Sequence, residues 1–539
     1  MQGKPFREDR KWWRGMLVAA LFVAAVPYLV VWLAAGRGHV YTGLLFNPYD
    51  GYTYLAKMRE GWMGAWRFTL PYTPHPGNGA YLYLFHLALG HLAHLLHLSV
   101  PLVYNLARVA GAVLLVAALG WYFALLFPHD AFARRFAWAV ASFGLGMGWV
   151  ILPWARQMPP ADFWVSEAYP LLSMLTNAHF PWALAAFLVL IRPGPARWWD
   201  VLAALGLALL SPFGVVLVGF LLALQFVVEY TFPENAEHGR NSQLATRNSR
   251  FATRNSFPIH LPFPPAASQT FCRGLLVALG GLPYTAYVYW VTHHDPILAQ
   301  WTAQNRTLLP PWWNLLAAFS PWAVVAVAAL WRRHPAVRRL ALWALAAFGL
   351  AALPSALQRR FLLGVYVPLV GLAAIWVASR PHRLRWAKAL VLLVLPGALV
   401  MLLLPLKGAI QKEPIWYLSR DEYHALVWLR ENTPRDAIVL ASPDMGAIIP
   451  AWSGRRVLYG HPMETVDGPR YKELVGDFFR RCLKGAAAWK FLHDEGVDYI
   501  FLGPRERKLG GLPVFMPPQA VAARFGSVTI YRVPEEGGR

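Results

Sequence analysis

The residues best suited to chemistry in this sequence are a few charged side chains beside long apolar stretches. Asp50 lies in the loop after the first such stretch, with Tyr52 and Tyr54 close to it in sequence. A carboxylate kept at a bilayer surface is costly, so its first interpretation is functional, as a general base or a metal ligand. The structural alternative is a helix N-cap, because Asp followed by Gly-Tyr-Thr is reasonable capping chemistry. Position alone leaves both open.

A second candidate group is cationic. Gln358, Arg359 and Arg360 stand together at the predicted outer end of a span, where the charge pattern of membrane proteins disfavours basic residues. Arginine suits multidentate recognition of phosphate, so the hypothesis is a site for a lipid phosphate. The alternative is that both side chains simply reach the interface by snorkelling.

Further polar residues occur in loops predicted to share the outer face. Glu167, with Asp162 and His179 near it in sequence, is the candidate for a second carboxylate, although ordinary surface charges fit equally well. His75 lies between two prolines and is a candidate for lining a cavity.

Histidines form two further groups. Four of them share one helical face without a carboxylate or cysteine companion, which favours interfacial packing over metal binding. His293, His294 and Asp295 favour ordinary hydrogen bonding over a metal site. The helical four are His86, His91, His94 and His97.

The composition indicates that membrane-spanning helices position these residues. Of 539 residues, 57% are hydrophobic and 14% charged, and several stretches exceed the ~18 apolar residues of a spanning helix. The net charge of +22 collects in short loops without interleaved aromatics, which indicates membrane orientation and excludes nucleic-acid binding. The two cysteines are predicted on opposite faces, so no disulfide is expected.

The charge pattern predicts a polytopic α-helical membrane protein of about eleven spans with a cytoplasmic N-terminus. The transmembrane domain covers residues 1–406, and residues 36–101 form its first external loop, with a helix over 80–98 along the interface. The spans are predicted at 15–35, 103–127, 136–154, 180–191, 201–210, 214–229, 274–291, 313–330, 340–356, 361–378 and 389–406.

Two segments differ from the spans. Residues 231–269 contain a repeated ATRNS and are predicted to be a disordered cytoplasmic loop. Residues 407–539 alternate helical and strand patterns and predict a small extracytoplasmic α/β domain, with strands at 437–442, 456–461, 497–503 and 527–533.

No Walker loop, Rossmann fingerprint, HExxH or GxSxG motif is present, so an enzyme of this kind would use an already activated substrate. With Asp50, Tyr52 and Tyr54 in a first external loop, the Arg359-Arg360 loop and WLRENTP at 428–434, the chain resembles the GT-C superfamily of polytopic glycosyltransferases. That group includes protein mannosyltransferases, oligosaccharyltransferases and aminoarabinose transferases. The resemblance covers nearly the whole chain.

The resemblance implies an inverting transfer from a polyprenyl-phosphate sugar to a lipid, protein or polysaccharide acceptor at the outer face of the cell membrane. Asp50 would be the base, with Glu167 as the second carboxylate, and the arginine pair would stabilise the leaving phosphate. Many relatives carry an acidic pair where this chain has Asp50-Gly51, so no metal ligands are assigned and Mg²⁺ or Mn²⁺ is left open as a cofactor. The implied substrate-binding residues are Tyr52, Tyr54, His75, His179, Gln358, Arg359 and Arg360.

The alternative is a transporter or non-catalytic assembly component for lipid-linked saccharides. The predicted helix break at Ser211-Pro212-Phe213 and the outer basic residues would also suit transport. Polar clusters are predicted only on the outer face and no internal repeat is evident, which favours the transferase.

Overall fold

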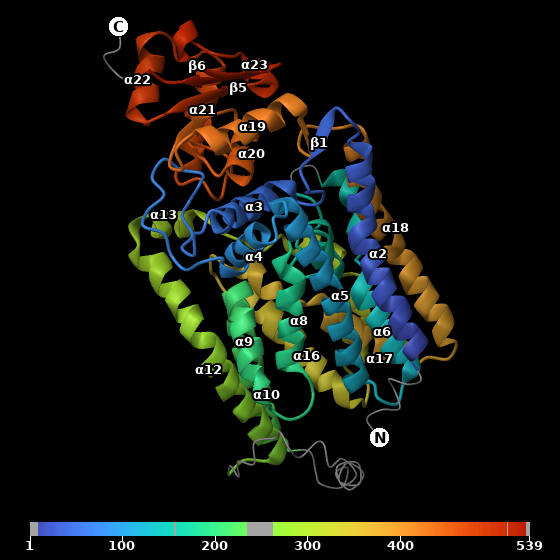
Figure 1. Cartoon of the computed structure of the whole chain (residues 1–539). Helices are drawn as coiled ribbons and strands as arrows, with labels where there is room; N and C mark the ends of the chain where they lie inside the picture. Colours follow the sequence, from blue (N-terminus) through green and yellow to red (C-terminus); the bar gives the residue numbers. More distant parts are fainter. Residues whose placement is uncertain (1–8, 156–157, 234–261, 515, 535–539) are drawn as a thin grey trace. The chain divides into compact units, whose positions relative to one another are not determined.

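A computed structural model describes residues 9–155, 158–233, 262–514 and 516–534 (Figure 1). Internal contacts divide the chain into two compact units. Unit 1 comprises Met1–Val26, Arg108–Val288 and Thr307–Leu404, and unit 2 comprises Pro27–Ala107, Tyr289–Arg306 and Pro405–Arg539. The predicted boundary between residues 406 and 407 stays a prediction. Four long helices have residues in both units: α2 (Arg10–Ala34), α5 (Val100–Leu126), α12 (Pro265–His294) and α18 (Arg383–Ile410).

Unit 1 is otherwise built from apolar helices. They are α6 (Ala131–Phe143), α7 (Pro170–Leu175), α8 (His179–Ile191), α9 (Trp199–Leu210), α10 (Pro212–Thr231), α14 (Trp312–Phe319), α15 (Trp322–Ala329), α16 (Pro335–Ala352) and α17 (Tyr366–Ala378), with short 3-10 turns η1 (Gly148–Val150), η2 (Leu152–Trp154), η3 (Ala161–Phe163) and η4 (Gln358–Leu362).

The predicted fold class is confirmed: this is a mostly helical, multi-pass membrane protein with a small C-terminal sheet. Seven helices among the described residues are long and apolar enough to cross a membrane, or eight if the bent pair α14 and α15 is one span. Three shorter apolar helices also occur, of which α8 and α9 were predicted as spans and α4 (Leu84–Leu95) as an interfacial helix. The count of eleven stays a prediction.

Two predicted spans differ from the helices observed. The third, over residues 136–154, is wrong as a continuous helix because α6 ends at Phe143 and 3-10 turns follow. Glycines at 144, 146 and 148 follow the end of α6, and glycine is unfavourable in the interior of a helix. The eighth is bent by 79° between α14 and α15, where Pro321 cannot continue the helical hydrogen bonds.

The predicted loop over residues 231–269 lies mostly outside the described residues. Where it is described, α10 ends at Thr231 and α12 begins at Pro265, so the last residues assigned to this loop are helical.

In unit 2 the helices α3 (Pro48–Trp62) and α4 lie side by side (Figure 1). Their backbones touch. A Cβ on Gly61 would lie 2.1 Å from the Leu87 carbonyl oxygen, and one on Gly90 would lie 2.0 Å from that of Met58. Glycine at both positions therefore allows the close approach that fixes α3 against α4.

The C-terminal part of unit 2 contains a five-stranded mixed sheet in the order β4-β3-β5-β7-β6. β4, β3 and β5 are parallel, and β7 and β6 extend the sheet antiparallel. Four strands match the prediction, and β6 was missed. The strands are β3 (Ile438–Leu440), β4 (Arg456–Val457), β5 (Tyr499–Leu502), β6 (Val521–Phe525) and β7 (Val528–Arg532), and the helices are α19 (Arg420–Asn432), α20 (Pro443–Ser453), α21 (Gly468–Phe479), α22 (Ala486–Asp494) and α23 (Pro504–Leu509), with η5 (Pro518–Ala520).

The first external loop and the C-terminal region belong to the same unit. β1 (His39–Tyr41) pairs antiparallel with β2 (Tyr417–Ser419), and the Trp416 indole N–H donates to the Leu45 carbonyl at 2.9 Å. These contacts place the C-terminal region around the segment that carries Asp50.

Candidate active site

Asp50 lies in the first turn of α3 with its carboxylate partly open to solvent. Asn47, in a left-handed conformation (φ 50°), precedes Pro48 and is the N-cap, so the N-cap interpretation of Asp50 is wrong. The Asn47 side-chain amide donates to Asp50 Oδ2 at 2.6 Å, and the Asp50 side chain is 46% exposed. The positive end of the helix dipole stabilises its negative charge.

The other carboxylate oxygen faces a residue that the sequence did not suggest. His461 Nε2 lies 3.3 Å from Asp50 Oδ1, and the His461 side chain is only 7% exposed. Its Nδ1 accepts a hydrogen bond from the Met463 backbone N–H at 3.1 Å. No short-range signal links residues so far apart in sequence, because the contact is created only by folding.

The His461–Thr465 segment, which we call the HPMET loop, is held tightly on α3. Lys57 is 1% exposed and pairs with Glu464 at 2.7 Å, with its ammonium group 4.2 Å from the Tyr83 ring centre. Asp50 and Lys57 therefore meet the same loop from two turns of one helix.

The end of α13 (Pro296–Gln304) also holds this loop. Gln304 donates to the Thr465 carbonyl at 2.6 Å, and Asn305 donates to the Met463 carbonyl at 2.9 Å. The loop beside Asp50 is thus fixed from two separate segments of unit 2.

The aromatic and histidine residues predicted near Asp50 have different surroundings. Tyr52 is 1% exposed and donates to the Ile415 carbonyl at 2.7 Å, which makes it a support for α3, and burial raises the pKa of its phenol. Tyr54 stacks on His86 with ring centres 4.6 Å apart. His75 is exposed in the turn after Thr73. Substrate contact by these residues stays a prediction.

Three of the four histidines, His86, His91 and His94, lie against aromatic residues. His91 stacks on Trp66 at 4.2 Å and contacts the Ala65 carbonyl at 3.0 Å, and His94 meets Trp62 edge-on at 5.0 Å. Likewise Asp295 accepts from two backbone N–H groups at the start of α13, as the hydrogen-bonding interpretation expected.

In unit 1 the structure brings together Glu167, Arg359 and Arg360. Glu167 is 3% exposed, with Arg360 Nη1 at 2.6 Å and Arg359 Nη2 at 4.0 Å from its Oε1. Burial would raise the pKa of Glu167, but the two guanidinium groups outweigh burial and hold that pKa below its usual value. The carboxylate is ionised, and two cations face one anion.

The arginines are held rather than extended toward solvent. The Arg359 guanidinium lies 4.6 Å from the Trp164 ring centre, and that of Arg360 lies 5.4 Å from the Phe213 ring centre. Gln358 is used within the loop: it accepts from the Leu309 N–H at 3.3 Å and donates to the Leu353 carbonyl at 3.1 Å. Both guanidinium groups are held by Glu167 and aromatic rings, which argues against simple snorkelling.

Two other predicted residues of unit 1 are buried. His179 is 8% exposed at the start of α8, with its ring 4.2 Å from that of Phe180. Asp162 is fully buried and accepts from the Gly148 N–H at 3.0 Å, and burial raises the pKa of Asp162 to about 7.

The described residues do not form a recognisable metal site. Across the ranges that the structure covers, no group of three or more His, Cys, Asp or Glu side chains is placed to hold an ion. Asp50 and His461 offer two such groups, and the His461 ring already uses Nδ1. The sequence left Mg²⁺ or Mn²⁺ open as a cofactor, and that assignment stays open.

Comparison with known proteins identifies the fold. No family model matches the sequence, and the search of curated proteins finds no match. The oligosaccharyltransferase of Archaeoglobus fulgidus, tethered to an acceptor peptide, superposes with a TM-score of 0.52 at 15% identity over 92% of this chain and 69% of that one. Its apo form gives 0.51 at 15% identity over 91% and 69%. The chain has the GT-C glycosyltransferase fold.

A third GT-C structure is ArnT from Cupriavidus metallidurans bound to undecaprenyl phosphate. It matches over 96% of this chain and 98% of its own length, at 13% identity and a TM-score of 0.48. The two oligosaccharyltransferase similarities establish the GT-C fold alone, and the chemistry has to be argued from this chain's residues.

Proposed function

We propose that this protein of GT-C fold is a glycosyltransferase that moves a sugar from a polyprenyl-phosphate donor to an acceptor hydroxyl at the outer face of the cell membrane. The observation that carries the proposal is Asp50. On this fold it is a half-exposed carboxylate, held at one oxygen by Asn47 and contacted at the other by His461. Such a group can accept a proton without reorganising.

In this reaction Asp50 takes the proton of the acceptor hydroxyl as its oxygen attacks the anomeric carbon. The new carbon–oxygen bond forms while the bond from that carbon to the phosphate oxygen breaks, so the sugar inverts and polyprenyl phosphate leaves. A positioned general base typically contributes about 10²–10⁴ in rate.

The arginine pair of unit 1 is proposed to bind the donor phosphate. Two guanidinium groups are fixed beside the Glu167 carboxylate, and charge developing on a leaving phosphate is stabilised by such fixed cations. Glu167 then positions Arg359 and Arg360, a role that its lowered pKa favours over proton transfer. A role for Glu167 as a second catalytic carboxylate stays a prediction. The same holds for substrate binding by His75, His179, Tyr54 and Gln358.

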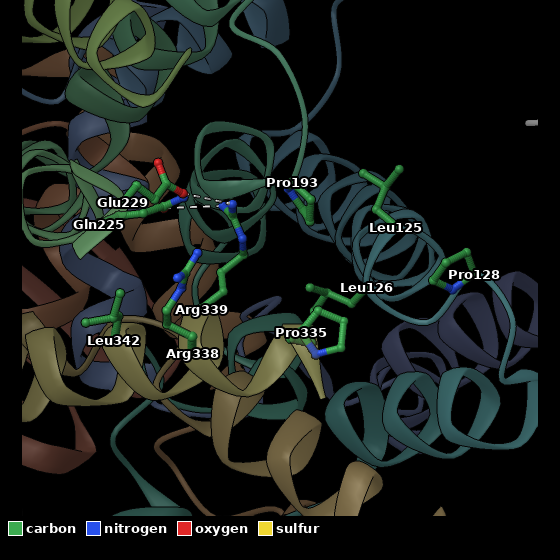
Figure 2. Close-up of a pocket in the computed structure, with 11 residues that line it drawn as sticks. Leu125, Leu126, Pro128, Pro193, Gln225, Glu229, Pro335, Arg338, Arg339 and Leu342 are labelled. Carbon is green, nitrogen blue, oxygen red and sulfur yellow. Dashed lines mark hydrogen bonds and ion pairs between the residues drawn. The ribbon is translucent and has the colours of Figure 1, made fainter. Parts of the chain in front are cut away.

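A cavity in unit 1 bears on the transport alternative (Figure 2). Its volume is about 260 Å³, and Arg339 in its wall contacts Gln225 at 3.3 Å and Glu229 at 3.7 Å. Pockets for small ligands are usually about 300–1,000 Å³, so this cavity is too small for a lipid-linked saccharide. It gives the transporter alternative no support.

The test uses purified protein in liposomes with a panel of labelled polyprenyl-phosphate sugars and membrane extract as acceptor. The proposal expects label to become covalently attached to an acceptor. The test variant is Asp50→Asn, and its matched control is Asp444→Asn. Asp444 is an exposed carboxylate of the same unit, and its partner is the Tyr49 hydroxyl. Label that crosses the liposome membrane without a new bond would instead support transport.

A further inference from the structure

Each ring nitrogen of His461 lies against a different kind of partner. Nδ1 accepts the Met463 N–H at 3.1 Å, so that nitrogen carries no proton. The proton of the neutral ring is therefore on Nε2, which lies 3.3 Å from Asp50 Oδ1.

We infer that His461 is a positioning residue for Asp50: its imidazole holds Nε2 against the carboxylate, and the HPMET loop thereby completes the proposed active site. This inference rests on the proposed function of Asp50. At 7% exposure, His461 is closed to substrate, whereas Asp50 at 46% is open, so the imidazole orients the base and is not a second base itself.

The loop is built to keep the imidazole in place. Lys57 anchors Glu464 three residues after His461, and Gln304 anchors the Thr465 carbonyl. The Thr465 hydroxyl oxygen also accepts from the His461 backbone N–H at 3.4 Å. With Asn47 at Oδ2 and His461 at Oδ1, both carboxylate oxygens have a fixed neighbour, which limits rotation of the group while leaving room for an acceptor hydroxyl.

Two substitutions separate positioning from loop anchoring. In His461→Gln the side-chain amide N–H can replace Nε2–H toward Asp50, whereas in His461→Asn the amide oxygen replaces Nδ1 as acceptor for Met463 but cannot reach Asp50. We expect kcat in His461→Asn to fall about tenfold or more with an unchanged donor KM, while His461→Gln stays within about threefold of wild type. The reverse order, Asn active and Gln inactive, would make His461 only a loop anchor and overturn the inference.

Thermal unfolding needs no catalytic activity, so it tests the Asp50–His461 contact separately from the proposed function. The Tm decreases of His461→Asn and Asp50→Asn, measured singly and together in detergent, are expected to be non-additive because each removes the same contact. Additive decreases would refute the contact even in a protein whose donor is unknown. If wild type transfers no sugar but the decreases are non-additive, the proposed function fails and the Asp50–His461 contact stands. If His461→Asn does not fold, a folded but inactive His461→Gln still refutes the inference.

Discussion

Asp162 gives a prediction whose magnitude follows from its burial. The side chain is fully buried, with the Gly148 N–H on one oxygen, and burial raises its pKa from the usual 3.8 to about 7. A carboxyl group with a raised pKa favours the folded state at low pH, and that advantage is lost as pH rises from about 4 through about 7. At about 1.4 kcal/mol for each pH unit, the loss reaches about 4 kcal/mol.

Asp162→Asn removes this titration while keeping a neutral group of the same shape. An unfolding entropy of about 2.1 cal/mol/K per residue for 539 residues converts 4 kcal/mol to about 3–4 °C. We therefore expect the Tm of Asp162→Asn, relative to wild type, to rise by about that amount between pH 4 and pH 8.

The assay is thermal unfolding in detergent across this pH range for both proteins. Burial also raises the pKa of Glu60 to about 8, although two hydrogen bonds from Thr69 oppose it, so wild type alone would report both groups. Glu60 is common to both proteins, and only their difference reports Asp162. A Tm difference that is constant with pH would refute the reasoning.

Three further substitutions test the ion pairs. Arg360→Ala is expected to weaken donor binding at least about tenfold, because it leaves Glu167 facing the phosphate, and unchanged donor affinity in a binding titration would move the phosphate site elsewhere. Glu167→Gln should change kcat less than about tenfold if Glu167 only positions the arginines, whereas a loss of 10² or more would restore it as a catalytic carboxylate. Lys57→Met leaves Glu464 buried without its cation and should destabilise the fold by about 3–5 kcal/mol in denaturant unfolding, a cost that Glu464→Gln should reduce in the double variant. An undiminished stability of Lys57→Met would contradict the buried ion pair.

The sequence was sufficient wherever a local rule applied. Asp50 was found because a carboxylate next to an apolar stretch is costly, and Arg359 and Arg360 because they contradict the charge rule. The strands over 437–442 and 497–503 followed from alternating apolar residues. These signals depend only on neighbours in the chain.

What was missed depends on contacts between distant segments. His461 reaches Asp50 only because β4 and α20 bring the HPMET loop onto α3, and nothing near residue 461 predicts that contact. A local signal was also overlooked: the third span was wrong because α6 ends at Phe143, where the glycines at 144, 146 and 148 begin. β6 was missed because Val521–Phe525 gains its strand character from pairing with β7 across the turn at Gly526.

The central claim is tested most directly by single-turnover transfer in wild type and Asp50→Asn at saturating donor, once the labelled panel has identified that donor. We expect Asp50→Asn to bind donor with wild-type affinity but to transfer sugar at least about 10²-fold more slowly. Transfer by Asp50→Asn within a few fold of wild type, at equal donor occupancy, would contradict the assignment of Asp50 as the base.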